Sequence, residues 1–98
     1  MTYRDFLLAD IRLVILRILN ELPGYRANSS ILSNALERFG HTQTRDQVKT
    51  QLMWLAEQGL VTVETVGPVI VADLTERGGD IATGRATVPG VSRPRAGG

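Results

Sequence analysis

The chain has 98 residues, 43% of them hydrophobic, and a formal net charge of +1. A chain of this length supports one domain with one modest core, and not two. It contains no cysteine, which excludes disulfides, thiolate chemistry and cysteine-ligated zinc sites.

The charge is unevenly distributed along the chain. Residues 1–80 contain eight Lys or Arg and ten Asp or Glu, which gives −2, whereas residues 81–98 add three Arg and give +3. Neutralisation of phosphates supplies most nonspecific affinity for DNA. The slightly acidic first 80 residues therefore argue against strong nonspecific DNA binding.

A first helix is predicted over residues 5–22, and it ends at Pro23-Gly24, which cannot continue it. At about 100° per residue, eight apolar side chains share one broad face and form the expected core face. These are Leu7, Leu8, Ile11, Val14, Ile15, Ile18, Leu19 and Leu22.

The same helix carries a second face on its opposite side, with the heptad spacing of a coiled-coil seam and charged borders. Its members are Phe6, Ala9, Leu13, Leu16 and Asn20. Because one layer of helices cannot cover both faces, we expect a homodimer in which the first helices pair through these residues. The alternative is that the tail or the last helix of the same chain folds over this face.

The apolar run of the first helix is interrupted by charged and polar residues, so it predicts no membrane span. Acidic Asp5 and Asp10 are also unlike the basic start of a signal peptide. We therefore expect a soluble, cytoplasmic protein. With one histidine and no cysteine, neither a metal nor a cofactor is expected.

Two further helices are predicted by their capping signals. Asn28-Ser29-Ser30 offers N-caps for a second helix that ends at Gly40, with Ile31, Leu32, Ala35, Leu36 and Phe39 as its expected buried face. The sequence TRDQ (residues 44–47) is a T-x-x-Q capping box that opens a third helix, which ends at Gly59. The short connection between the two helices is typical of a helix-turn-helix.

Two strands follow, over residues 60–64 and 69–74, joined by a turn at Gly67-Pro68. Thr75 caps a last short helix that runs to about residue 84 and is weakened by Gly78 and Gly79. Residues 85–98 are rich in Arg, Pro and Gly without apolar periodicity, and we expect a disordered tail there.

This order of elements resembles the winged-helix superfamily of prokaryotic regulators. The junction LxxLxxxGLV (residues 52–61) and the motif LTxxG (residues 74–78) carry the resemblance. It implies an α+β winged helix-turn-helix domain over residues 1–84, with a three-helix core, a β-hairpin wing and a short C-terminal helix. The whole chain, including YRDFLLADIR and VPGVSRP, is also similar to small proteins encoded by Mu-like bacteriophages and prophages.

The resemblance implies a DNA-binding regulator or accessory factor, acting in the bacterial host cytoplasm if it is encoded by a phage. In the superfamily the third helix enters the major groove and a basic wing tip contacts the minor groove or backbone. The expected contacts with double-stranded DNA are Arg45, Gln47, Lys49 and Thr50, with Gln43 or solvent-exposed His41 touching phosphate. Two acidic residues on the outward face, and a wing tip (residues 65–68) without Lys or Arg, depart from this pattern.

The alternative function is a protein-interaction module that binds a host or phage protein. An exposed pair of Met53 and Trp54 would suit such a site, because Met and aromatic residues are enriched at interface centres. Trp54 could instead fold against the wing and extend the core. Catalysis is not expected, because no phosphate-binding loop or nucleophile–base arrangement is present.

Overall fold

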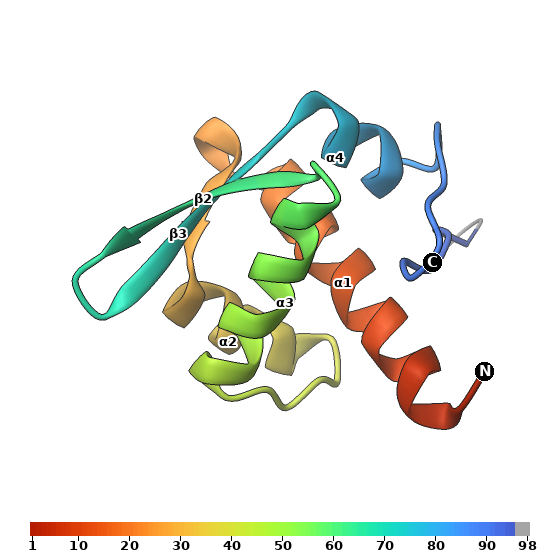
Figure 1. Ribbon diagram of the computed structural model, residues 1–98, viewed down its shortest axis with the longest axis horizontal. Helices are drawn as coiled ribbons and strands as arrows, with labels where there is room; N and C mark the ends of the chain where they lie inside the picture. The colour runs from red at the N-terminus through yellow and green to blue at the C-terminus, as the bar shows by residue number, and fades with distance from the viewer. Residues whose placement is uncertain (96–98) are drawn as a thin grey trace.

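The computed structural model describes residues 1–95, which form helices and a small antiparallel sheet (Figure 1). In chain order the elements are α1 (Tyr3–Glu21), the 3-10 helix η1 (Pro23–Tyr25), β1 (Arg26–Asn28), α2 (Ser29–Arg38), α3 (Arg45–Glu57), β2 (Val61–Val66), β3 (Val69–Leu74) and α4 (Glu76–Ala82). Helices α1, α2 and α3 enclose the core, and the β2–β3 hairpin extends to one side of α3 as a wing (Figure 1). The fold is the predicted winged helix-turn-helix.

The capping signals determine where the long helices begin. The hydroxyl of Thr44 accepts a hydrogen bond from the backbone N–H of Gln47, and the Gln47 side chain accepts one from the N–H of Thr44. The side chain of Asn28 caps α2 in the same way, by accepting from the N–H of Ile31. Both sites confirm the predicted starts of these helices.

The sheet has a third strand that the sequence analysis does not predict. The strand order is β1-β3-β2, and Ala27 of β1 pairs with Ala72 of β3. Ser29, the first residue of α2, is buried, and its hydroxyl accepts a hydrogen bond from the N–H of Ile70. A strand of three residues is too short to show the alternation that predicts longer strands.

Helix α2 buries a narrower face than predicted. Leu32 and Leu36 are fully buried, as expected, but Ile31 is 50% exposed and Phe39 is 52% exposed. The buried face includes small Ser33, whose hydroxyl donates to the carbonyl oxygen of Gln43 in the turn before α3. Small polar residues therefore bring α2 close to its neighbours, and two large apolar residues are left at the surface.

Helix α4 needs glycine in its first turn. A Cβ added at Gly78 would lie 2.0 Å from the carbonyl oxygen of Leu60, the residue that precedes β2. Gly78 therefore lets the helix pack directly against the start of the wing. The stabilisation from this close packing offsets the low helix propensity of glycine. The prediction of a short last helix is confirmed, with Thr75 as its N-cap.

In the described part of the chain, no helix has both the length and the apolar character that crossing a bilayer requires.

Candidate nucleic-acid interface

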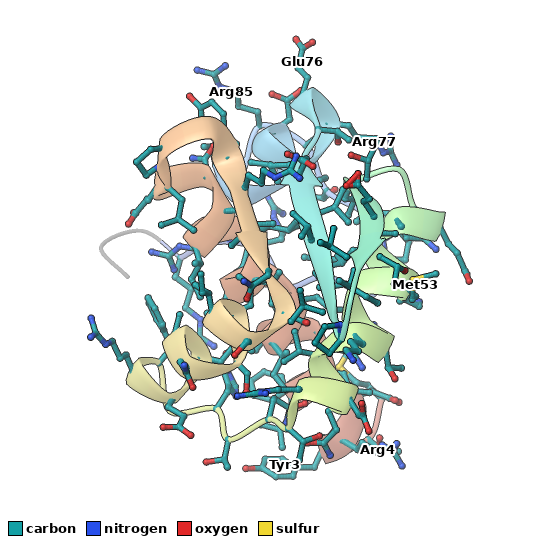
Figure 2. All side chains as sticks on the ribbon, turned by 90° about the vertical axis from the view of Figure 1, so that its left-hand side faces the viewer. Tyr3, Arg4, Met53, Glu76, Arg77 and Arg85 are labelled. Carbon is teal, nitrogen blue, oxygen red and sulfur yellow. The ribbon has the colours of Figure 1, made fainter. Side chains whose placement is uncertain are left out.

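The third helix is held with one face in the core and the other at the surface. Val48, Leu52 and Leu55 are fully buried, and Gln51 is buried beside them. The outward residues follow the helical period along the other side, and Figure 2 shows this side at the edge of the molecule around Met53. The exposed positions are Arg45, Asp46, Gln47, Thr50, Met53 and Glu57.

Three of the predicted DNA contacts are exposed on the first half of α3. Arg45, Gln47 and Thr50 are all exposed. The side-chain oxygen Oε1 of Gln47 accepts the capping-box hydrogen bond from Thr44. The side-chain NH₂ group of Gln47 is not used in that bond. The Thr50 hydroxyl donates to the carbonyl oxygen of Asp46, one turn earlier. These exposed side chains offer a cation, an amide donor and a hydroxyl oxygen along the first half of α3.

Lys49, the fourth predicted contact on α3, lies against the tip of the wing. Its ammonium donates a hydrogen bond to the carbonyl oxygen of Pro68 at the wing tip, with an Nζ–O distance of 2.8 Å, and lies 4.0 Å from Oδ1 of Asp46. Lys49 therefore joins α3 to the tip of the wing. This contact also places a positive charge next to a tip that has no Lys or Arg of its own.

The turn between α2 and α3 does not present His41 to solvent as predicted. Nε2 of His41 lies 2.7 Å from Oδ2 of Asp10 on α1, and the His41 side chain is only 11% exposed. The expectation of an exposed turn histidine is wrong, because α1 supplies a carboxylate within hydrogen-bond distance of the imidazole. Gln43 is partly buried, and its amide donates to the carbonyl oxygen of Thr42.

Arg12 makes contacts that no local sequence pattern predicts. Its Nε donates to the side-chain oxygen of Gln51 at 2.8 Å, and one of its terminal nitrogens donates to the carbonyl oxygen of Gly90 at 3.0 Å. Its guanidinium also lies 3.9 Å from the centroid of the Trp54 ring. Partial burial lowers the pKa of Arg12 and nearby Asp5 raises it, the first effect being larger. No sequence pattern links residues 12, 51, 54 and 90, which only the fold brings together.

The C-terminal segment packs against α1, where the sequence predicts disorder. Val91 is buried and Val88 is partly buried against the core, and the N–H of Ser92 donates to the carbonyl oxygen of Ala9. Residues 96–98 of the predicted tail lie outside the described residues. The segment thus forms part of the domain at least from Val88 to Ser92.

This packing replaces the predicted pairing of first helices. Ala9, Leu13 and Leu16 are buried within one chain, beneath α4 and the C-terminal segment, while Phe6 remains 45% exposed. The face that we expected to pair with a second copy is therefore covered by the chain's own last residues. The chain's own tail and last helix thus cover this face, as in the second of the two expectations, and a dimer through this face is not supported.

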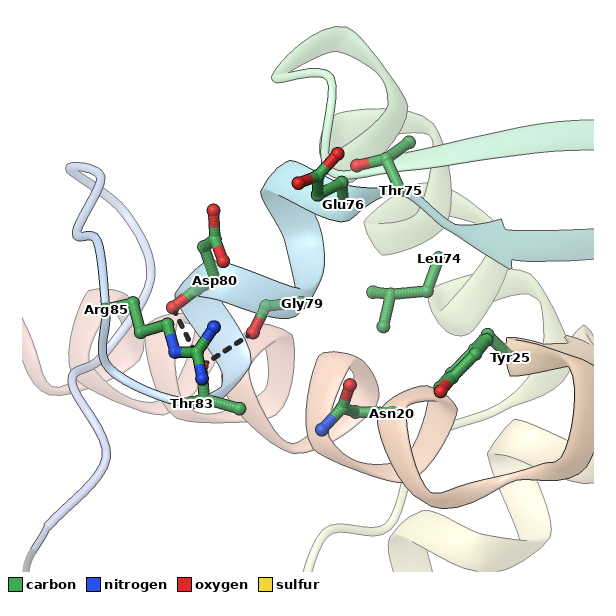
Figure 3. Close-up of a pocket in the computed structure, with 9 residues that line it drawn as sticks. All are labelled: Asn20, Tyr25, Leu74, Thr75, Glu76, Gly79, Asp80, Thr83 and Arg85. Atoms are coloured by element: carbon green, nitrogen blue, oxygen red, sulfur yellow. Dashed lines mark hydrogen bonds between the residues drawn. The ribbon is translucent and has the colours of Figure 1, made fainter.

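Asn20, the last residue of the predicted seam, lines a surface cleft between α1 and α4. Figure 3 shows its amide below the α4 backbone at Gly79, with the Tyr25 ring on one side and Arg85 on the other. Leu74 forms part of the lining near Tyr25. Asn20 therefore belongs to this cleft and lies apart from α3.

The two candidate protein-binding residues are placed differently. Met53 is 47% exposed at the middle of α3. Trp54 is partly buried against the core and contacts the guanidinium of Arg12 and the backbone near Gly90. Of the Met53–Trp54 pair, only Met53 is available as a large exposed contact.

The fold and the position of α3 define a winged-helix protein. A solved structure of a complex of the protein hsRosR-S1 aligns with a TM-score of 0.64 and 22% sequence identity, covering 80% of this chain and 69% of that chain. This likeness confirms the fold.

The chain belongs to the family of protein gp26 of Escherichia phage Mu. It is 53% identical to gp26 over 91 residues, which span 93% of this chain and 94% of gp26. An uncharacterized protein of Haemophilus influenzae is 45% identical over 78 residues, or 79% of this chain and 76% of that protein. No protein-family model matches the chain. The relatives confirm the phage and prophage resemblance.

Proposed function

We propose that this phage protein binds duplex DNA through the outward face of α3, as a regulator or DNA-associated accessory factor. The observation that carries the proposal is the shared exposure of Arg45, Gln47 and Thr50 on the first half of a helix whose other face is buried in the core. A helix held in this way can enter the major groove without unfolding any part of the domain.

The chemistry of the three side chains suits base edges and phosphates. A guanidinium binds the O6 and N7 acceptors of guanine in a bidentate manner, and an amide suits the N6 and N7 edge of adenine. The hydroxyl oxygen of Thr50 can accept a hydrogen bond from a base while its proton is donated to the Asp46 carbonyl oxygen. Arg45 and Gln47 therefore have the donors required for reading a sequence, and their proximity to the α3 N-terminus keeps them near backbone phosphates.

The wing contributes through Lys49 in this proposal. Its tip, residues 65–68, has no Lys or Arg, so the wing itself supplies no cation to a neighbouring phosphate. The ammonium of Lys49 lies at that tip because it donates to the Pro68 carbonyl oxygen. One cation thus fixes the wing and supplies positive charge beside it.

The test compares Arg45→Glu with Arg38→Glu, an equal change of charge at an exposed position on α2. A glutamate at position 45 lies in the first turn of α3, where the helix dipole favours an acid, so the fold should persist. We expect Arg45→Glu to weaken duplex DNA binding about tenfold or more, because a good base or phosphate contact is worth about 1–3 kcal/mol. Arg38→Glu should have a much smaller effect. Fluorescence anisotropy at low and moderate salt measures both.

A protein-interaction module is the second candidate, and the exposure of Met53 favours it. Acidic Asp46 and Glu57 lie near Met53 on the same face and would oppose phosphates. The discriminating variant is Met53→Ala, which should reduce capture of a protein partner and leave DNA affinity nearly unchanged. A folded wild-type protein that fails to bind duplex DNA even at low salt refutes the DNA proposal and favours this candidate.

A further inference from the structure

Two arginines outside the helix-turn-helix lie at opposite ends of α3. Arg4, on the first turn of α1, lines a groove together with Gln47 and Thr50 of α3. Arg4 is exposed, and its guanidinium is at the end of α3 where the candidate base contacts begin. Helix α1 therefore extends the polar surface of α3 beyond its N-terminus.

At the other end, Arg77 of α4 is tied to the C-terminus of α3. Its Nε donates a hydrogen bond to the carbonyl oxygen of Gln58, which is the C-cap residue of α3, at 3.3 Å. Figure 2 shows Arg4, Met53 and Arg77 along the same edge of the molecule, with Met53 between the two arginines. The cations are therefore on the side of the molecule that α3 presents to solvent.

Helix α3 is longer than the major groove of DNA is wide. Helix α3 has 13 residues, and at 1.5 Å per residue its axis is about 20 Å long. The major groove is about 12 Å wide, and rows of phosphates border it on both sides. A helix that crosses the groove thus brings both of its ends to the bordering phosphates.

We propose that Arg4 and Arg77 bind phosphates of the two strands that border the major groove occupied by α3. This inference rests on the proposed function, and it adds the contacts that hold the helix in register. The two arginines add positive charge to a face on which Asp46 and Glu57 cancel the charges of Arg45 and Lys49. They contact the backbone of any DNA sequence and so contribute affinity without base specificity.

Two other arginines among the described residues lack this arrangement. Arg26 lies 3.3 Å from Asp73 and 3.9 Å from Glu64, so acidic partners in the sheet offset its charge. Arg85 lines the cleft of Asn20 and is on the opposite side of the view in Figure 2 from the α3 edge. Arg85 is thus an exposed arginine that should not contact DNA, which makes it a matched control.

The experiment measures the affinity of the full chain for a mixed-sequence duplex by fluorescence anisotropy at several salt concentrations. Each phosphate contact contributes about 0.9 to the slope of the logarithm of affinity against the logarithm of salt concentration. We expect Arg4→Ala and Arg77→Ala each to weaken binding several-fold and to lower this slope by about 0.9. The double variant should lower it by about twice as much, and Arg85→Ala should change neither quantity.

Folding is checked by circular dichroism and thermal unfolding of each variant. Because Arg77 also donates to Gln58, Arg77→Gln is the second variant, since it keeps an N–H donor and removes the charge. It should give the same lowered slope as Arg77→Ala. If wild type binds DNA and the slopes of both single variants equal that of wild type, this inference is overturned while the α3 proposal survives. No wild-type binding at low salt overturns both.

Discussion

The guanidinium of Arg12 lies 3.9 Å from the centroid of the Trp54 ring, and Gly90 passes over the same ring. The stack joins α1, α3 and the C-terminal segment, which are far apart in the sequence. Arg12 also donates hydrogen bonds to the Gly90 carbonyl oxygen and to the Gln51 side chain. Its guanidinium therefore has three partners, which are Gly90, Gln51 and the Trp54 ring. These contacts fix the last part of the chain to the back of α3.

Gly90 should be required at this crossing. A Cβ there would lie 2.7 Å from Cζ2 of Trp54, and its φ of +93° disfavours any L side chain. Gly90→Ala should therefore lift the segment from the ring and shift the emission of the single tryptophan to longer wavelength. The matched control is Gly84→Ala, where φ is +83° but the nearest atom of Pro94 is 3.7 Å away.

The control should lose about 1 kcal/mol of unfolding free energy from backbone strain alone. Gly90→Ala should lose at least about 1 kcal/mol more, because overpacking adds to the strain. Chemical denaturation followed by tryptophan fluorescence measures both. Equal losses in the two variants, with unchanged emission, would show that the segment does not rest on Trp54.

Removing the C-terminal segment should restore the self-association that the sequence of α1 predicts. A chain that ends at Ala86 lacks Val88 and Val91, so the heptad-spaced face around Ala9 and Leu13 becomes partly exposed. An exposed apolar face of this kind favours association. Size-exclusion chromatography with light scattering should show a larger species for the truncated chain and a monomer for the full chain. A truncated chain that stays monomeric and equally stable argues against this covering role.

The sequence predicts the elements of this fold well because their signals are local. Three such signals are the capping box at Thr44, the Gly-Pro turn of the wing and the core stripe of α3. Each of them is contained in a short stretch of sequence. The partner of an apolar face is not a local property. Heptad spacing in α1 shows that something covers Leu13, but a second chain and the chain's own tail satisfy the same pattern.

In the candidate site, too, the sequence predicts the local features but not the contacts between separate elements. The helical period places Thr50 on the outward face of α3 and Arg45 to one side of it, and both residues are exposed in the structure. The period does not show that Lys49 contacts Pro68 or that His41 contacts Asp10, because both contacts depend on how separate elements pack. Arg4 and Arg77 were not among the predicted contacts because they lie outside the helix-turn-helix, at the starts of α1 and α4.

The start of α1 should depend on pH through Asp5. The N–H of Thr2 donates to the Asp5 carboxylate and the Thr2 hydroxyl accepts from the N–H of Asp5. The backbone hydrogen bond from Thr2 is the largest cause that lowers the pKa of Asp5 below its ordinary value of 3.8. Since the folded-state pKa is depressed, the carboxylate stabilises the cap above 3.8, and this contribution is lost as the pH falls through the folded-state pKa.

An NMR titration of the Asp5 carboxyl carbon should give a midpoint below 3.8. Amides in the first turn of α1 should exchange faster once that midpoint is passed. The variant Asp5→Asn keeps an acceptor for the Thr2 N–H but has no charge, so its exchange should lack this acid step. A midpoint at or above 3.8 would mean that the cap does not persist in solution.

The contact between Lys49 and Pro68 should control the mobility of the wing tip. The Lys49 ammonium donates to the Pro68 carbonyl oxygen across 2.8 Å, while Val66 and Val69 form the last pair of the β2–β3 ladder beside it. Lys49→Met keeps the length of the side chain and removes the donor. We expect faster hydrogen exchange at the Val66 and Val69 amides and a loss of about 0.5–1 kcal/mol, because the contact is partly solvated.

Lys49→Arg is the control, since it retains both the charge and N–H donors within reach of the same carbonyl. Its exchange rates should remain close to those of wild type, and its DNA affinity should be largely kept. Lys49→Met should lose DNA affinity through both the missing charge and the mobile tip. If exchange at the wing is identical in Lys49→Met and wild type, the contact does not hold the tip, and any loss of affinity in that variant is due to charge alone.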